Sequence, residues 1–188
     1  MVTERPILRG ERVWLRPVEM SDIMGTSLDD VELAHYAGFR RGFSRVEGER
    51  FAQHLAAQGD GEPNFAICPL GEDRSIGSCG LREVDRTNGS AEVSIFITAR
   101  EDWSKGYGTD AMAALLDFAF GALRLERVWL RVFDYNERAV RSYEKAGFVR
   151  EARMRHDRFH RGAHHDVWLM GIVRPDWESL DRKYTWDY

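Results

Sequence analysis

Three consecutive runs of strand-forming residues, separated by turn residues, constrain the fold of this chain more than any other feature of its sequence. They span Asn64 to Pro69, Ile76 to Val84 and Ser90 to Ile97. Gly71-Glu72-Asp73 separates the first two runs, and Asn88-Gly89 separates the second from the third. An Asn-Gly pair between two such runs is the strongest short-range signal for a β-hairpin. The sequence therefore predicts an antiparallel meander in the middle of the chain.

Helical and strand patterns surround this meander on both sides. In the clearest helix, apolar residues recur at helical spacing from Met112 to Leu123. A capping box over Ser44–Glu47 starts an earlier helix that runs to about Gly59, and Asn136 starts a later one. The other expected elements are a strand over Arg12–Val18, one or two short helices over Asp22–Tyr36 with a break around Asp29-Asp30, strands over Arg127–Val132, Phe148–Phe159 and His165–Val173, and a short helix or tail from Pro175. This order predicts a mixed α/β sheet with flanking helices.

Length and composition indicate one ordinary globular domain. The chain has 188 residues, 43% hydrophobic and 31% charged, so we expect a single domain over residues 1–188, with a core in about 10–175 and a tail in 176–188. The net charge of -4 argues against a nucleic-acid partner. No run has the length and apolar character of a membrane span or a secretory signal. We therefore expect a cytoplasmic protein with no membrane partner, in which Cys68 and Cys79 are buried thiols.

A glycine-containing loop before the clearest helix is the first candidate binding site. It runs from Trp103 to Thr109 with the sequence WSKGYGT. Glycine lets a backbone approach a ligand closely, and the free N–H groups at a helix start suit an anion. The loop therefore indicates a phosphate-bearing ligand, although a purely structural helix start would have the same appearance.

Two known phosphate-binding motifs do not account for this loop. The Walker pattern is absent, which argues against a P-loop nucleotidase. The run from Gly106 to Ala111 fits GxGxxA, but a dinucleotide fingerprint directly follows a buried parallel strand. Here a charged loop over Thr98–Lys105 intervenes, and the preceding strand belongs to the antiparallel meander. A dinucleotide oxidoreductase is therefore a distant alternative.

Five motifs in order make the chain resemble the GNAT superfamily of N-acetyltransferases, in particular its branch of ribosomal-protein alanine and polyamine acetyltransferases. They are ERVWLRPVEMSDI, AEVSIFI, WSKGYGTDA, NERAVRSYEKAGF and HDVWLMGIVRPDW, and they cover almost the whole chain. The resemblance implies a mostly antiparallel central sheet with one splayed pair of parallel strands. It also implies acetyl-coenzyme A (acetyl-CoA) as co-substrate, no metal, and a primary amine on a protein N-terminus or a small molecule as acceptor.

The resemblance assigns cofactor contacts to the loop and to the strand before it. In the family, the matching loop holds the coenzyme A pyrophosphate through backbone amides. Here Trp103 stands where Arg or Gln is usual, which leaves the backbone contribution of the next residues untouched: Ser104, Lys105, Gly106, Tyr107, Gly108 and Thr109. Phe96 and Ile97 are the expected contacts of the pantetheine arm, on a strand that would splay from Arg127–Val132. One exposed N–H there would stabilise the oxyanion of the transferred acetyl group.

The resemblance also supplies an acid and a base. Tyr143 matches the tyrosine that faces the coenzyme sulfur, and a hydroxyl with a pKa of about 10 can protonate a thiolate whose acid has a pKa near about 8.5. Glu92 matches a glutamate that is the base in several members, while others use water chains. Asn136 matches an asparagine that contacts the cofactor. The structural alternatives are a core aromatic for Tyr143, an arginine partner for Glu92 and a helix cap for Asn136.

The acceptor and the assembly are less constrained. His156, His160, His164 and His165 fall in a predicted hairpin, where spacings of four do not converge, so we expect no metal. By resemblance, this hairpin turn and the loop over Ala37–Phe43 flank the acceptor entrance. A homodimer could form through the last strands or through the Trp-rich C-terminus. The alternative to an enzyme is a non-catalytic acyl-CoA-binding or regulatory module of the same fold.

Overall fold

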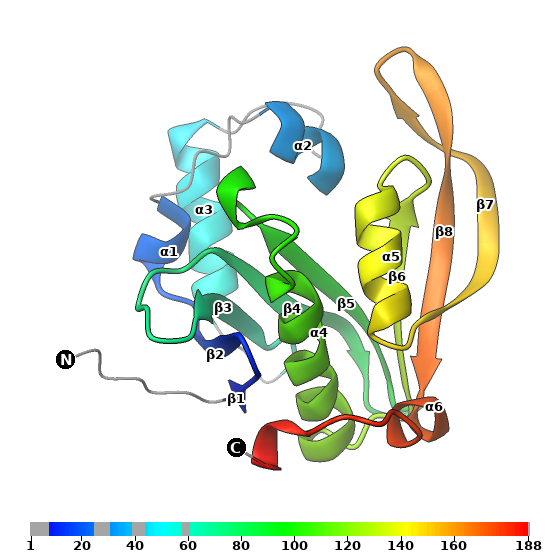
Figure 1. Cartoon of the computed structure of the whole chain (residues 1–188). Coiled ribbons are helices and arrows are strands. Elements are labelled where there is room, and N and C mark those ends of the chain that lie inside the picture. The colour runs from blue at the N-terminus through cyan, green and yellow to red at the C-terminus, as the bar shows by residue number, and fades with distance from the viewer. Residues whose placement is uncertain (1–7, 25–30, 39–43, 58–60, 188) are drawn as a thin grey trace.

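An eight-stranded sheet forms the centre of the structure, a computed structural model that describes residues 8–24, 31–38, 44–57 and 61–187. The strands follow the order β1-β2-β3-β4-β5-β6-β8-β7 (Figure 1). Neighbouring strands are antiparallel except β5 and β6, which run parallel. The strands are β1 (Leu8–Arg9), β2 (Val13–Pro17), β3 (Asn64–Pro69), β4 (Gly77–Asp85), β5 (Ser90–Ile97), β6 (Arg127–Phe133), β7 (Val149–His160) and β8 (Ala163–Val173).

Helices cover both faces of the sheet. α4 (Tyr107–Asp117) and α5 (Glu137–Lys145) pack on one face and enclose the main hydrophobic core with it. α3 (Arg45–Ala56) packs on the other face, where Ala52 and Leu55 meet Ala66 of β3 in a smaller core. The remaining helical segments are α1 (Met20–Met24), α2 (Val31–Ala37), α6 (Arg174–Glu178), the 3-10 turns η1 (Arg100–Asp102) and η3 (Thr185–Asp187), and the π-helical turn η2 (Phe118–Ala122).

The two parallel strands separate soon after they begin. Their pairing covers three residues on each strand, Ser90–Glu92 opposite Arg127–Trp129. Beyond it, β5 continues with β4 as far as Ile97, and β6 continues with β8 as far as Phe133. The mixed sheet with a splayed parallel pair, which the sequence motifs implied, is confirmed.

Most expected elements are present with boundaries that differ by only a few residues. β3 and β5 have the predicted bounds, since turn residues flank both. α3 begins with the predicted capping box, in which Ser44 Oγ accepts from the Glu47 N–H and the Glu47 carboxylate accepts from the Ser44 N–H. α3 ends at Ala56, a few residues before the expected end at about Gly59, and the break expected around Asp29-Asp30 lies outside the described residues.

Candidate active site

The loop from Trp103 to Gly106 leaves the amino terminus of α4 open. Ser104 has a φ of +61° and Gly106 a φ of +85°, so the chain turns sharply into the helix. No side chain caps the first turn of α4, so its N–H groups lack the acceptor that most helices provide. A hollow of about 660 Å³ lies beside them, lined by Arg12, Ser104, Lys105, Gly106 and Tyr107. This arrangement suits an anionic ligand.

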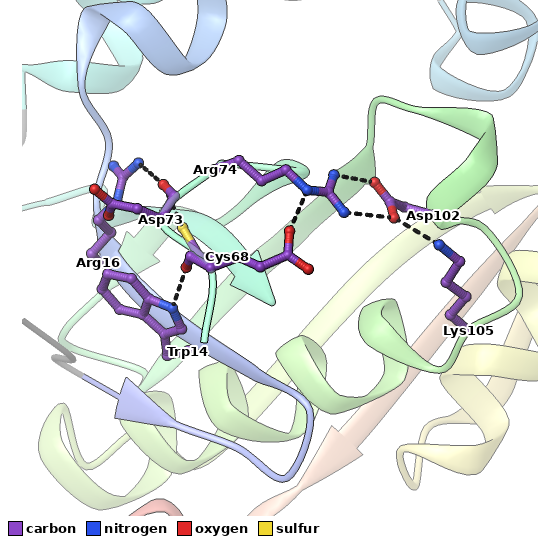
Figure 2. Close-up of polar contacts among 8 residues, drawn as sticks. Trp14, Arg16, Cys68, Asp73, Arg74, Asp102 and Lys105 are labelled. Carbon is purple, nitrogen blue, oxygen red and sulfur yellow. Dashed lines mark hydrogen bonds and ion pairs between the residues drawn. The ribbon is translucent and has the colours of Figure 1, made fainter. Parts of the chain in front are cut away.

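A buried carboxylate fastens the loop to the turn between β3 and β4 (Figure 2). Asp102 is 1% exposed and accepts hydrogen bonds from both terminal nitrogens of Arg74, at 2.7 and 3.2 Å. Lys105 Nζ donates to the same carboxylate at 3.1 Å. The hydrogen bond from Arg74 lowers the pKa of Asp102 below its usual value. The carboxylate therefore stays ionised at neutral pH and holds Lys105 beside the hollow.

The turn that carries Arg74 is itself fixed from β2. Trp14 Nε1 donates to the Glu72 carbonyl at 3.1 Å, and Arg16 Nη2 donates to the Asp73 carbonyl at 3.4 Å (Figure 2). Trp14 is fully buried, so its position is set by packing. The polar network thus runs from the first strands of the sheet to the loop.

The other predicted loop residues lie together at the end of β5. The Trp103 indole Nε1 donates to the Ile97 carbonyl at 2.9 Å. Gly108 lies over the same residue, since a methyl group on it would stand 4.0 Å from Ile97 Cγ1. Thr109 Oγ1 lies 2.7 Å from Ser142 Oγ, which joins the first turn of α4 to α5. The Lys105 ammonium lies 5.9 Å from the centre of the Tyr107 ring.

The hydrogen-bond register identifies the β5 backbone groups that face β4. Thr98 N donates to the Ile76 carbonyl directly opposite it, at 2.9 Å. In an antiparallel pair, hydrogen-bonded positions alternate with non-bonded ones. Phe96, opposite Ser78, is therefore a bonded position. The backbone of Phe96, one of the two predicted pantetheine contacts, is directed to β4.

The intervening residues of β5 direct their backbone groups toward the splay, the region where β5 and β6 separate. Ile95 and Ile97 fall between the positions bonded to β4. On the same edge of this hairpin, Gly89 O accepts from Arg127 N of β6 at 3.0 Å, which confirms the alternation. The pairing with β6 ends at Glu92, so beyond it this edge is left without a neighbouring strand. Ile97, the other predicted pantetheine contact, faces this gap, and Ile95 faces it as well.

Tyr143 lies on α5 next to the first turn of α4. Its ring packs against the main core and lies 6.1 Å from that of Phe148, centre to centre. Burial raises the pKa of Tyr143 to about 12. Its hydroxyl forms no hydrogen bond with the residues that the structure describes. The side chain therefore presents a neutral, unpartnered O–H.

Glu92 and Asn136 both have partners inside the protein. Glu92 is 3% exposed, with Arg131 Nε 3.1 Å from Oε1 and Arg82 Nη2 3.3 Å from Oε2. It projects from the sheet face opposite α4 and α5, because the neighbouring Ala91 lies in the main core. Asn136 caps α5, with Oδ1 accepting from the Ala139 N–H at 3.3 Å. The structural roles considered for both residues are therefore observed.

Comparison with known proteins identifies the family. The acetyltransferase (GNAT) domain matches residues 12–149, well over half of the chain. The chain belongs to the GNAT acetyltransferases. This GNAT chain is 32% identical over 169 residues to the spermidine N(1)-acetyltransferase of Escherichia coli, covering 86% of each sequence. It is 28% identical over 184 residues to the "Probable N-acetyltransferase YjcK" of Bacillus subtilis, covering 92% of this chain and 100% of that one.

A solved structure of a relative supports the fold. The spermidine N-acetyltransferase of Vibrio cholerae, crystallised with CoA and spermine, matches with a TM-score of 0.77 and 25% identity, over 89% of this chain and 98% of that one. The fold and family predicted from the motifs are thus confirmed, and polyamine acetyltransferases are among the relatives. In the described part of this GNAT chain, no helix has the length and apolar character needed to cross a membrane.

In this GNAT domain, stacked side-chain rings pack α2 against the β7–β8 hairpin, near the carboxyl end of β6 (Figure 1). His35 Nδ1 lies 2.6 Å from His160 Nε2 at the hairpin tip. Tyr135 stacks on His35 with ring centres 4.4 Å apart, and its hydroxyl donates to the His35 carbonyl at 3.2 Å. Desolvation by burial, followed by the charge of Arg161, lowers the pKa of both His35 and His160. The two rings are therefore mostly neutral at neutral pH.

The other side of α2 meets the loop before α4. Tyr36 lies edge-on to Trp103 with ring centres 5.9 Å apart. The Arg138 guanidinium lies 3.7 Å from the centre of the Trp103 ring and 5.3 Å from that of Tyr36. Arg138 has no carboxylate partner among the described residues. We call the five residues that join α2 to its neighbours the α2 cluster: His35, Tyr36, Tyr135, Arg138 and His160.

The other histidines of the hairpin are dispersed. His156 stacks on His164 with ring centres 5.4 Å apart, and His165 Nδ1 lies 3.6 Å from Asp134 Oδ1. Within the described ranges, no three His, Cys, Asp or Glu side chains are grouped to hold a metal ion. Of the aromatic loop expected at the acceptor entrance, residues 39–43 lie outside the described residues.

Sequence reasoning did not identify the network behind the loop or the α2 cluster. Asp102 stands directly before Trp103, but its partner Arg74 lies 28 positions away, and His35 lies 125 positions from His160. No periodic pattern links residues so far apart. The one available signal was an aspartate beside a loop expected to bind an anion, which requires a nearby cation.

Proposed function

We propose that this protein transfers the acetyl group of acetyl-CoA to a primary amine by direct attack. The observation that carries the proposal is a convergence at the splay. The open amino terminus of α4, the unpaired edge of β5 at Ile95 and at the N–H of Ile97, and the helix α5 that carries Tyr143 all lie around it. The Vibrio cholerae relative crystallised with CoA and spermine supports this assignment.

The described residues offer contacts to the pyrophosphate and to the pantetheine arm of coenzyme A. The hollow beside Ser104–Tyr107 offers backbone N–H groups and cations to a pyrophosphate. The backbone of Ile95 and the N–H of Ile97 offer strand-like hydrogen bonds to the amides of a pantetheine arm, as an exposed sheet edge does to a peptide, while the Ile97 carbonyl accepts from Trp103. When bound, acetyl-CoA supplies the acetyl carbon, whose bond to sulfur breaks as the amine nitrogen bonds to it.

Tyr143 is the acid in this proposal. Its raised pKa of about 12 keeps the hydroxyl protonated throughout the physiological range. A hydroxyl with no protein partner can donate a hydrogen bond to a departing thiolate. Full proton transfer from this hydroxyl is uphill, because a thiol has a pKa of only about 8.5, so Tyr143 acts by stabilising the negative charge on sulfur as the C–S bond breaks. An N–H of the free β5 edge supplies the oxyanion contact.

Glu92 is our candidate base, and a chain of water molecules is the competing route for the amine proton. The carboxylate lies on the splayed strand where β5 leaves β6. Both of its oxygens already accept from Arg82 or Arg131. It can take a proton only if one of these contacts loosens, so its contribution to the rate should be smaller than that of Tyr143.

Neither cysteine provides a nucleophile for an acyl-enzyme. Burial raises the pKa of Cys68 to about 11 and raises that of Cys79 as well. Both thiols are buried and protonated at neutral pH, whereas a reactive cysteine must be a thiolate. This supports direct transfer in a ternary complex.

Calorimetric titration with acetyl-CoA, with NADH as the control, tests the cofactor. Binding of acetyl-CoA alone is the expected result, and no binding or a preference for NADH would refute the proposal. Thiol release, corrected for hydrolysis, is then measured with a panel of primary amines. Amine-dependent release is expected from an enzyme, whereas binding with no release for any amine would identify a non-catalytic acyl-CoA module.

A further inference from the structure

The turn between β1 and β2 is fixed to the first turn of α4. The Asp110 carboxylate accepts three backbone N–H groups of this turn, those of Glu11, Arg12 and Val13, at 3.1, 2.8 and 2.9 Å. Gly10 lies so close to the same carboxylate that a Cβ there would stand 2.4 Å from Asp110 Oδ2. The position of the turn is therefore set by the helix that carries the anion site.

This turn places an arginine side chain in the hollow. A methyl group on Gly106 would stand 3.4 Å from both Cδ and Nε of Arg12, so the Arg12 side chain lies along the loop. Arg12 lines the hollow together with Ser104, Lys105, Gly106 and Tyr107. Its backbone is held by Asp110, while its guanidinium lies beside Gly106, the N-cap residue of α4.

The charges around the hollow leave Arg12 as the uncommitted cation. Lys105 is bound to Asp102, and Asp102 is in turn bound to Arg74. The Arg12 guanidinium has no ion pair or hydrogen bond with any residue that the structure describes. An arginine fork with no protein acceptor, beside free helix N–H groups, matches the geometry of a phosphate.

We propose that Arg12 binds the pyrophosphate of coenzyme A, so that the β1–β2 turn forms the second wall of the phosphate site. The inference rests on the proposed function, since it names a further ligand of the same co-substrate. Asp110 is the positioning residue, because it fixes the turn without entering the hollow.

The experiment measures binding of three ligands to four proteins by calorimetry. The ligands are coenzyme A, 3′-dephospho-coenzyme A and pantetheine, and the proteins are the parent, Arg12→Ala, Arg12→Lys and Arg9→Ala. Arg9 is the matched control, because it is an exposed arginine of the same hairpin that lines a neighbouring groove but not this hollow. Unchanged thermal unfolding of each variant verifies that the turn still folds.

Arg12→Ala should weaken coenzyme A and dephospho-coenzyme A equally, by about tenfold, which is the loss expected for one charge-assisted hydrogen bond. Arg12→Lys should recover part of the affinity, and Arg9→Ala should bind like the parent. Unchanged binding by Arg12→Ala, an equal loss in Arg9→Ala, or a loss confined to coenzyme A would each overturn the assignment to pyrophosphate. Failure of the parent to bind coenzyme A would instead refute the proposed function.

Discussion

The two sides of the splay are held together by different interactions. On the phosphate side, two carboxylates carry the contacts: the buried Asp102 binds Arg74 and Lys105, and the half-buried Asp110 binds three backbone N–H groups. On the side of the α2 cluster, stacked rings and a hydrogen bond between two histidines hold α2 to the β7–β8 hairpin. No carboxylate bonds to His35 or His160 among the described residues.

This difference matches what each side has to recognise. The phosphate side has to hold an anionic group in a fixed position, and charged contacts with backbone support keep its site in one shape. Stacked neutral rings impose fewer directional demands, so the α2 cluster can change in sequence or position without loss of the phosphate site. We therefore expect substitutions on the two sides to change different kinetic constants.

The largest effect should come from Tyr143→Phe, which removes only the proposed proton donor. The kcat should fall about 100-fold or more, the usual contribution of a positioned acid, with little change in the KM for acetyl-CoA. Steady-state kinetics measures both constants. Tyr184→Phe, the same change at a tyrosine near the C-terminus whose ring packs against Trp177, should behave like the parent. A Tyr143→Phe variant as fast as the parent would remove the assignment.

Asp102→Asn tests the phosphate side. Loss of this charge leaves Arg74 and Lys105 without their shared partner, so the KM for acetyl-CoA should rise about tenfold while that for the amine changes little. The free energy of unfolding should fall by about 2 kcal/mol, less than for a fully buried pair, because Arg74 is half exposed. Glu49→Gln, at the exposed Arg45–Glu49 pair, should cost less than about 0.5 kcal/mol. A rise in the amine KM instead would contradict the separation of the two sides.

Amines of different charge test the side of the α2 cluster. Because Arg138 has no carboxylate partner there, a polycation such as spermidine should have a kcat/KM about tenfold below that of a singly charged amine of similar length. Arg138→Ala should reduce this difference in kcat/KM between the two amines. Arg141→Ala, one turn along the helix and paired with Glu137, is the control. A preference for spermidine in the parent would show that acidic groups elsewhere bind the acceptor.

Glu92→Gln tests the base where the two strands part. A general base acts only when it is unprotonated, so replacing Glu92 should alter the fall in rate toward acid pH. The kcat should fall by less than about tenfold, because both carboxylate oxygens already accept from arginines. The pH–rate profile is measured beside that of Glu83→Gln, an exposed glutamate of the neighbouring strand. An unchanged profile would favour the route through water.

Acid should loosen the two sides at different pH. The pKa of His35 and of His160 lies below the unfolded value of about 6.5, so the unfolded state binds protons first and the α2 contact weakens as the pH falls below about 6.5. The pKa of Asp102 is also lowered, but its contribution is complete above about 3.9 and is lost only below that value. Hydrogen exchange at about pH 7 and 5.5, corrected for intrinsic rates, should therefore quicken in α2 and not in the phosphate loop. His160→Asn should reduce the acceleration of exchange in α2 at the lower pH. Equal changes in α2 and in the phosphate loop would refute the expectation that the two sides respond to acid differently.

Local signals in the sequence predicted the frame of the protein well. β5 has the predicted bounds, and Asn136 caps α5, because turn and cap residues act on their immediate neighbours. The direction of the backbone groups at Phe96 and Ile97 was not predictable, since it depends on register with β4 rather than on sequence pattern. The partners of Glu92 came from two other strands, and no local pattern announces such contacts.

The short contact between β5 and β6 has a consequence for cooperativity. Three residue pairs join one group of strands, β1 to β5, to the other, β6 to β8, so the seam contributes few of the sheet's hydrogen bonds. A ligand that bonds to the free edge of β5 while it contacts α5 would bridge these two groups of strands. Acetyl-CoA should then act as part of the sheet, narrowing the thermal transition as well as raising its midpoint.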